Sequence, residues 1–392
     1  MYDFDKTINR RNTNSLKWNV KSNELPMWVA DMDFETAPEI IEAIKTRVSH
    51  GVFGYNIIPD NWYEAYNYWW KKRHHWEIEK EWLMFSTGVV PIISSVVRKF
   101  STPAENVLIQ TPVYNIFFNS ILNNGRNVIE SPLLYSNGTY SIDFNDLEDK
   151  LSNPQTSLMI LCNPHNPIGK IWDKDTLSRI GDLCAKYNVI VISDEIHCDL
   201  TAPNKEYIPF ASVNDICKYN SITCIAPTKS FNIAGLQSAA VVVPNVNLRH
   251  KVYRALNNDE IAETNTFGVL AAVAAYTKGE AWLDELRVYL QENKDIVVEF
   301  LKKEIPELFV VSLDATYLLW VDCSKVCKET KTLVDHIRSE TGLFITAGNE
   351  YGNSGKNFVR INIACNKVTL LDGLNRLKKG ICSYENTFNK QD

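Results

Sequence analysis

Long apolar runs are missing from this 392-residue sequence. A helix that crosses a membrane needs about 20 consecutive, mostly apolar residues, and the apolar stretch Val189–Ile192 is far shorter. The first residues, Met1 to Arg11, are polar and lack the apolar segment of a secretory signal. We therefore expect a cytoplasmic protein with no membrane partner.

Dense blocks of lysine and arginine are also absent. The chain has 41 of these residues against 47 aspartates and glutamates, which gives a formal net charge of −6. Proteins that bind nucleic acid or an anionic membrane surface use a basic patch. We therefore expect no nucleic-acid partner.

Paired cysteine motifs are missing as well. The 9 cysteines are scattered without a Cys-x-x-Cys pair, and Cys323 and Cys327 have no histidine close by in sequence. Zinc sites use paired cysteines with further ligands, so we predict no metal site. Buried free thiols in a reducing compartment are the expected state of these residues.

The composition, with 45% hydrophobic and 22% charged residues, is that of an ordinary globular protein. The chain is longer than the size at which one hydrophobic core stops growing, so two domains are expected. We predict a segment over residues 1–45 that packs with the small domain, a large domain over 46–285 and a small domain over 286–392.

The middle of the chain alternates short apolar segments with helical patterns, such as the spacing of apolar residues over Lys174–Tyr187. Strand–helix–strand order with apolar strands predicts an α/β fold with a mostly parallel sheet covered on both faces. The expected strands are Val107–Gln110, Leu158–Cys162, Val189–Ser193, Ile222–Ile225 and Ala239–Val243.

The last third of the chain has a different pattern. Trp282 to Ile305 carries apolar residues at helical intervals, which predicts one long helix. The shorter units Tyr317–Val321 and Phe358–Ile363 suit a small α+β domain. The first forty-odd residues precede the sheet region, so we expect both chain ends to build this domain.

Aromatic residues are concentrated between Trp62 and Trp76. The spacing favours a helix packed into the core of a dimer. A bulky entrance to an active site, built in part by a neighbouring subunit, is the alternative.

Two segments place a charged side chain directly after an apolar strand. A buried lysine such as Lys229 has a lowered pKa and can act as a nucleophile. Asp194 emerges at the end of a strand where open α/β sheets bind ligands, and there it can pair with a protonated ring nitrogen. Taken singly, the lysine could be an ordinary loop residue and the aspartate a helix N-cap.

Two further segments, Asn163–Gly169 and Ser86–Pro91, contain turn and helix-start signals. The first has two X-Pro pairs and a glycine, which favour a rigid loop that presents Asn166 as a hydrogen-bond donor, or simply a turn. In the second, a glycine precedes a helical pattern, and the free amides at a helix start bind anions such as phosphate.

Together and in this order, these segments resemble the fold-type I pyridoxal-phosphate (PLP) enzymes, the aspartate-aminotransferase superfamily. The resemblance covers nearly the whole chain and is closest to the MalY/PatB-type branch of cystathionine β-lyases and cysteine C–S lyases. The segments that carry it are Met27–Phe34, His50–Tyr55, Thr111–Tyr114, Asn163–Gly169, Ser193–His197, Lys229–Leu236 and Asn349–Gly352.

The resemblance implies a set of cofactor-binding residues. Lys229 would form the covalent link to PLP, Asp194 would pair with the ring nitrogen, and Tyr114 would stack on the ring. These three are the candidate catalytic residues. Asn166 would donate to the 3′-oxygen of the ring, which His197 could also reach. The remaining candidates, at the phosphate, are Thr87, Gly88, Val89, Thr228 and, from the second subunit of a homodimer, Tyr55.

The resemblance also implies a substrate site for an amino acid. Arg360 would bind the α-carboxylate as a bidentate fork. Asn163 would lie close to that carboxylate, and the backbone of Ala30 would close over it. Tyr55 of the other subunit would border the same site.

Two positions depart from the superfamily pattern. Ala226 stands where many relatives have a serine, and Gln237 stands where many aminotransferases have an arginine. The phosphate would then depend more on the helix start, Thr87, Thr228 and Tyr55.

The implied reaction is α,β-elimination from an S-substituted cysteine. The amine of Lys229, displaced by the substrate, would remove the Cα proton as a general base, and the cofactor would accept the electrons. A thiolate at Cβ would leave, and pyruvate and ammonia would follow, with cystathionine as one candidate substrate. An aminotransferase shares every step up to proton removal and is the first alternative. A PLP-binding regulatory or interaction protein is the second.

Overall fold

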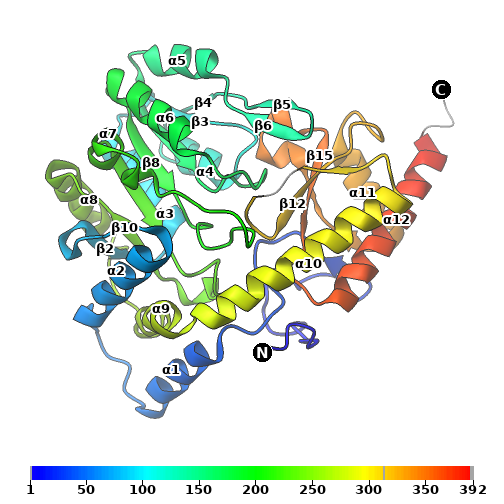
Figure 1. Ribbon diagram of the computed structural model, residues 1–392, viewed down its shortest axis with the longest axis horizontal. Helices are drawn as coiled ribbons and strands as arrows, with labels where there is room; N and C mark the ends of the chain where they lie inside the picture. The colour runs from blue at the N-terminus through cyan, green and yellow to red at the C-terminus, as the bar shows by residue number, and fades with distance from the viewer. Residues whose placement is uncertain (1, 312–313, 389–392) are drawn as a thin grey trace.

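The computed structural model describes residues 2–311 and 314–388. Its centre is a seven-stranded sheet in the order β2-β10-β9-β8-β7-β3-β4, with helices on both faces (Figure 1). The predicted α/β fold with a mostly parallel sheet is confirmed. The strands are β2 (Leu83–Ser86), β3 (Asn106–Ile109), β4 (Asn127–Glu130), β7 (Thr156–Cys162), β8 (Ile190–Asp194), β9 (Ser221–Ile225) and β10 (Ala239–Val242).

One strand of this sheet runs against the others. β10 pairs antiparallel with both β2 and β9, and the remaining neighbours pair in parallel. The expected strands all exist within two residues of their predicted ends, but β2 and β4 were not predicted. β4 has no buried residue to mark it.

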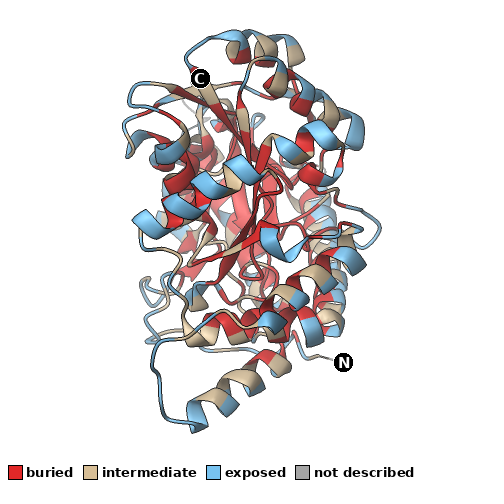
Figure 2. Cartoon of the chain, turned by 90° about the vertical axis from the view of Figure 1, so that its left-hand side faces the viewer, coloured by how far each residue is buried: buried red, intermediate tan, exposed pale blue. Residues whose placement is uncertain are grey.

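Alternate residues of the central strands pack on opposite faces, as the period of a β-strand requires. Leu158 and Ile160 of β7 belong to the core under α3 (Val89–Phe100), α4 (Ile116–Leu122) and α8 (Val246–Asn258). Met159 and Leu161 belong to the core under α5 (Phe144–Ser152), α6 (Lys174–Lys186) and α7 (Asp215–Tyr219). Figure 2 shows the resulting pattern, with buried strands inside and exposed outer faces on the helices.

The C-terminal part contains the second sheet, four antiparallel strands in the order β11-β12-β15-β14. The predicted long helix is confirmed as α10 (Glu280–Glu304). The other elements here are β11 (Phe309–Val310), β12 (Leu318–Asp322), β14 (Thr346–Ala347), β15 (Phe358–Asn362), α11 (Thr330–Thr341) and α12 (Lys367–Phe388), and a separate hairpin is formed by β5 (Leu134–Ser136) and β6 (Thr139–Ser141).

The N-terminal residues divide between the two parts of the molecule. β1 (Leu25–Pro26) pairs in parallel with β13 (Leu343–Phe344), so this segment joins the C-terminal part. Helix α1 (Pro38–Ser49) instead packs against α9 (Thr266–Lys278) of the central part. The predicted domain limits at residues 45 and 285 stay a prediction.

The aromatic segment forms helix α2 (Asp60–His74), which packs against α9 within the same chain. Trp62, Tyr66, Trp69 and Trp70 are all buried there. The expectation that this segment lines a dimer core or a site entrance is therefore wrong for these four side chains, because their partners come from their own chain.

The thiols follow the prediction with one exception. All 9 cysteines are free and 8 of them are buried, but Cys382 on α12 is exposed. Within residues 2–311 and 314–388, no helix is long and apolar enough to cross a membrane.

Truncation of the α2 core should destabilise the fold. Trp70 is fully buried and stacks on Tyr66 at a ring-centroid distance of 5.7 Å. We expect Trp70→Ala to lower the free energy of unfolding by roughly 3–5 kcal/mol, because a large core side chain leaves a cavity. Urea unfolding measures this, with Tyr68→Ala on the exposed face of the same helix as the control. Equal losses in the two variants would contradict the assignment of Trp70 to the core.

Candidate active site

The predicted site residues follow the ends of neighbouring strands. Asp194 ends β8, Lys229 follows β9, Asn166 follows β7, Tyr114 follows β3 and Gly88 follows β2. These five strands run in one direction, so their carboxyl ends lie along the same edge of the sheet, where α/β proteins bind their ligands.

Asp194 is a buried carboxylate. Its side chain is almost fully enclosed, and Oδ1 accepts a hydrogen bond from the Ile196 amide at 3.1 Å. Burial raises the pKa of Asp194 to about 7, against the opposing effects of the Ile196 amide and of Lys229. A buried carboxyl in this state gains most from a cationic hydrogen-bond donor, such as a protonated ring nitrogen.

Lys229 places its amine in the same region. Its Nζ donates to the Ala30 carbonyl at 2.6 Å. Burial and the positive charge of Arg360 lower the pKa of Lys229 to about 8, although Asp31 and Asp194 act in the opposite direction. A lysine with this pKa has an appreciable neutral fraction at physiological pH, which nucleophilic and general-base roles require.

Arg360 lies in β15 of the second sheet and is 6% exposed. Its two terminal nitrogens donate to neutral acceptors, Asn166 Oδ1 at 3.2 Å and the Trp28 carbonyl at 2.9 Å. Its Nε has no hydrogen-bond partner among the described residues. A buried guanidinium with neutral partners and a free donor suits an anionic ligand, such as an α-carboxylate.

Two aromatic side chains complete the centre of the site. Burial raises the pKa of Tyr114 to about 12, although Arg360 opposes this shift. His197 is buried, and burial together with the charges of Lys229 and Arg360 lowers its pKa to about 3. The imidazole is therefore neutral at physiological pH, and its Nδ1 has no partner in the part of the chain that the structure describes.

The predicted anion site lies at the start of α3. Gly88 is the N-cap residue, and the first-turn amides of Val89 and Val90 have no acceptor within the helix. A Cβ at Gly88 would lie 3.2 Å from Cδ of Pro91, tighter than an ordinary contact. Thr87 precedes this turn, with its amide donating to the Ile261 carbonyl at 3.0 Å.

Three further predicted site residues, Tyr55, Asn163 and Thr228, differ from one another in exposure and in hydrogen bonding. Tyr55 is fully exposed on the loop between α1 and α2, which projects from the chain (Figure 1). Asn163 is buried; its side chain donates to the Ile208 carbonyl at 3.1 Å and accepts from the Trp172 amide at 3.5 Å, so it joins its loop to the segment at Ile208. Thr228 is buried directly before Lys229.

Sequence reasoning missed Asp199, a buried carboxylate that is hydrogen-bonded to the residue next to Lys229. Asp199 accepts hydrogen bonds from Trp69 and His74, each at 2.9 Å, and from Ser230, the neighbour of Lys229, at 3.2 Å. His74, Cys198 and Asp199 bring three metal-binding atoms within 4.8 Å of one another, but His74 and Asp199 bind each other. The signal for Asp199 was a further carboxylate five residues after Asp194, in a segment that already contains Glu195.

Comparison with known proteins gives the family of the chain. The family described as aminotransferase class I and II matches residues 23–377. The chain belongs to this family. "Cystathionine beta-lyase PatB" of Bacillus subtilis is 41% identical over 97% of this chain and 100% of that protein. "Protein MalY" of Escherichia coli is 32% identical over 98% of each chain.

Solved structures are also similar over nearly the whole chain. Cystalysin from Treponema denticola, which contains pyridoxal 5′-phosphate, has a TM-score of 0.94 and 33% identity, covering 98% of this chain and 99% of that one. A PLP-bound C–S lyase from Staphylococcus hominis, in complex with L-cycloserine, has a TM-score of 0.91 and 33% identity over 97% and 98% of the two chains. The predicted fold-type I architecture is confirmed.

The charge environment of Lys229 predicts how it titrates. With the cofactor removed, the rate of acylation of Lys229 should rise through a pH of about 8, because only the neutral amine reacts. Arg360→Met should raise this pKa and Asp31→Asn should lower it, since they remove charges of opposite sign. Peptide mapping of the labelled protein measures the rate. A midpoint near that of an ordinary lysine, about 10.4, would contradict the burial of the amine.

Proposed function

We propose that this protein is a PLP-dependent cysteine-S-conjugate β-lyase that cleaves S-substituted cysteines to a thiol, pyruvate and ammonia. The site supports PLP chemistry through one arrangement, a lysine of lowered pKa between a buried carboxylate and a buried guanidinium. Elimination rather than transamination is supported by the full-length similarity to a cystathionine β-lyase, at 41% identity.

The residues fit the cofactor in charge and in placement. Pyridoxal phosphate supplies an electron sink for the pair left at Cα. Asp194 would hold the ring nitrogen, Lys229 would carry the covalent link, and Tyr114 would stack on the ring. Asn166 and His197 would serve the 3′-oxygen. The phosphate would be bound by Thr87, Gly88, Val89 and Thr228, and by Tyr55 of a second subunit.

The chain's own residues would orient the substrate and move its proton. Arg360 would bind the α-carboxylate through the donor that its neutral partners leave free. That grip places Cα beside Lys229, whose amine would take the Cα proton as the general base. A thiolate is a good leaving group, so its loss from Cβ can outrun return of the proton.

An aminotransferase is the second candidate function. A structure titled "putative aminotransferase", from Clostridium difficile, has a TM-score of 0.95 and 39% identity to this chain. The residues that remove the Cα proton are common to both reactions, so the products must separate them.

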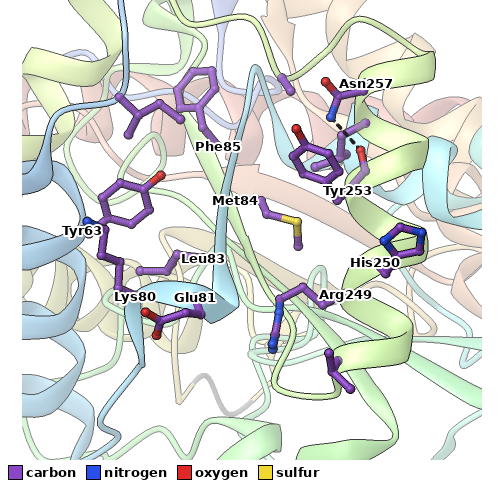
Figure 3. A pocket seen from close by; sticks show the side chains of 14 residues that line it. Tyr63, Lys80, Glu81, Leu83, Met84, Phe85, Arg249, His250, Tyr253 and Asn257 are labelled. Carbon is purple, nitrogen blue, oxygen red and sulfur yellow. Dashed lines mark hydrogen bonds between the residues drawn. The ribbon is translucent and has the colours of Figure 1, made fainter.

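We also propose a homodimer with shared active sites, in the cytoplasm. The loop that carries Tyr55 exposes Val52, Phe53 and Ile57 to solvent, and isolated apolar loops of this kind mark interaction surfaces. Beside it, a pocket of about 670 Å³ opens between β2 and α8, with Met84 and Tyr253 projecting into it (Figure 3). A second copy would cover both features.

The reaction products test the lyase assignment. With cystathionine or an S-alkyl cysteine, and without any keto acid, we expect thiol, pyruvate and ammonia in equal amounts over many turnovers. Thiol titration and a pyruvate assay measure them. An aminotransferase would stop after one turnover until a keto acid was added. Strict dependence on a keto acid, with no thiol released, would refute elimination and favour the aminotransferase.

Subunit mixing tests the shared site. Lys229→Ala and Tyr55→Phe should each be impaired alone, yet a mixed dimer would contain one site with neither change. After random exchange, about a quarter of all sites would be intact, and activity should recover in proportion. Mixing Lys229→Ala with Arg360→Lys is the control, because both changes act within one subunit's site and leave none intact. Equal behaviour of the two mixtures, with exchange verified, would contradict the sharing.

A further inference from the structure

A short stretch of backbone, residues 28–32, passes over the site and is held by side chains on both sides of it. We refer to it as the strap. Asn362, two residues after Arg360, donates to the carbonyls of Val29 at 2.5 Å and Asp31 at 2.6 Å. Asn232, three residues after Lys229, brackets Met32 by accepting from its amide at 2.9 Å and donating to its carbonyl at 3.0 Å. The strap is thus tied to both catalytic segments.

The outer side of the strap is fixed by ion pairs. Arg10 bonds the carboxylates of Asp31 and Asp33, each at 2.7 Å, and the fully buried Lys17 bonds Asp33 at 2.8 Å. Partly buried, bidentate pairs of this kind hold a backbone more firmly than exposed pairs do. The carbonyl groups of the strap therefore have set directions.

The middle carbonyl of the strap, that of Ala30, has two donors. One is the amine of Lys229 at 2.6 Å, and the other is the hydroxyl of Tyr317 at 3.0 Å. Tyr317 is 1% exposed, and it directly precedes β12, the strand that pairs with Arg360's strand β15. Burial raises the pKa of Tyr317, so the phenol remains a proton donor. It bonds the same acceptor as the catalytic amine.

We propose that Tyr317 is a positioning residue for proton transfer by Lys229, because its hydroxyl holds the Ala30 carbonyl where that carbonyl orients the amine. This inference rests on the proposed function. When the amine of Lys229 donates one hydrogen to the fixed Ala30 carbonyl, the lone pair of the amine points away from that carbonyl. The lone pair therefore has a set direction before the amine takes the Cα proton. Once the proton has moved to Nζ, the same carbonyl dipole stabilises the ammonium that results.

The experiment uses exchange of the Cα proton of L-alanine in D₂O, followed by proton NMR on the PLP-loaded enzyme. Alanine has no leaving group, so the measurement isolates proton transfer from elimination. We expect Tyr317→Phe to lower the saturating exchange rate about tenfold, within the contribution of a positioned general base. The alanine concentration at half-saturation should change less than about twofold, because Arg360 is unaffected.

A matched variant separates positioning from general loosening. Tyr140→Phe removes another buried hydroxyl, which accepts from Trp320 of β12 at 3.1 Å. It should leave the exchange rate unchanged. In the cofactor-free protein, amide hydrogen exchange over residues 28–32 should become faster in Tyr317→Phe and not in Tyr140→Phe. 4-Aminophenylalanine at position 317 keeps a donor and should restore Cα exchange.

The outcomes are distinct. A normal exchange rate in Tyr317→Phe, or equal losses in Tyr317→Phe and Tyr140→Phe, would overturn the role of Tyr317 and leave the proposed function standing. Failure of the 4-aminophenylalanine variant to recover, although folded, would overturn it as well. No Cα exchange by the unmodified enzyme would overturn the proposed function itself.

Discussion

Three charged side chains, Asp194, Lys229 and Arg360, share one buried region at the edge of the main sheet, and the rest of the site depends on their mutual interaction. An isolated buried ion costs several kcal/mol. Here the charge of Arg360 destabilises the charged form of Lys229, and the carboxylates of Asp31 and Asp194 partly offset that effect. Lysine binds its proton less tightly than arginine does, so Lys229 is the cation whose pKa falls. Its weakened basicity is therefore a property of the arrangement and not of the lysine alone.

This arrangement requires two sheets to meet. Asp194 and Lys229 come from the parallel sheet, and Arg360 comes from the antiparallel one. The hydrogen bonds from Arg360 to Asn166 and to the Trp28 carbonyl link the antiparallel sheet to the loop after β7 and to the strap. A small displacement of one sheet would therefore change both the charge balance at Lys229 and the place where a carboxylate binds.

Much of this could be predicted from the sequence, because the informative patterns are local. Apolar strands followed by Asp194 or Lys229 indicate the parallel sheet and its ligand edge, and the resemblance supplied Arg360. Features that depend on contacts between residues far apart in the chain could not be predicted from local patterns. The burial of α2 depends on α9, some 200 residues away, and the antiparallel direction of β10 depends on how the chain returns to β2. The resemblance supplied Ala30, but the hydrogen bonds that Asn362, Asn232 and Tyr317 make to the strap could not be predicted, since they go to backbone groups, which carry no residue signature.

The pairing of β1 with β13 and the bonds from Asn362 to the strap have a consequence for biosynthesis. The strap and β1 leave the ribosome before Asn362 and β13, because they precede these partners in the chain. Contacts so far apart in sequence form late and slowly. While the residues of the central sheet are being synthesised, the strap and β1 therefore lack these partners. During that interval, the segment is available to chaperones or to the wrong sheet edge.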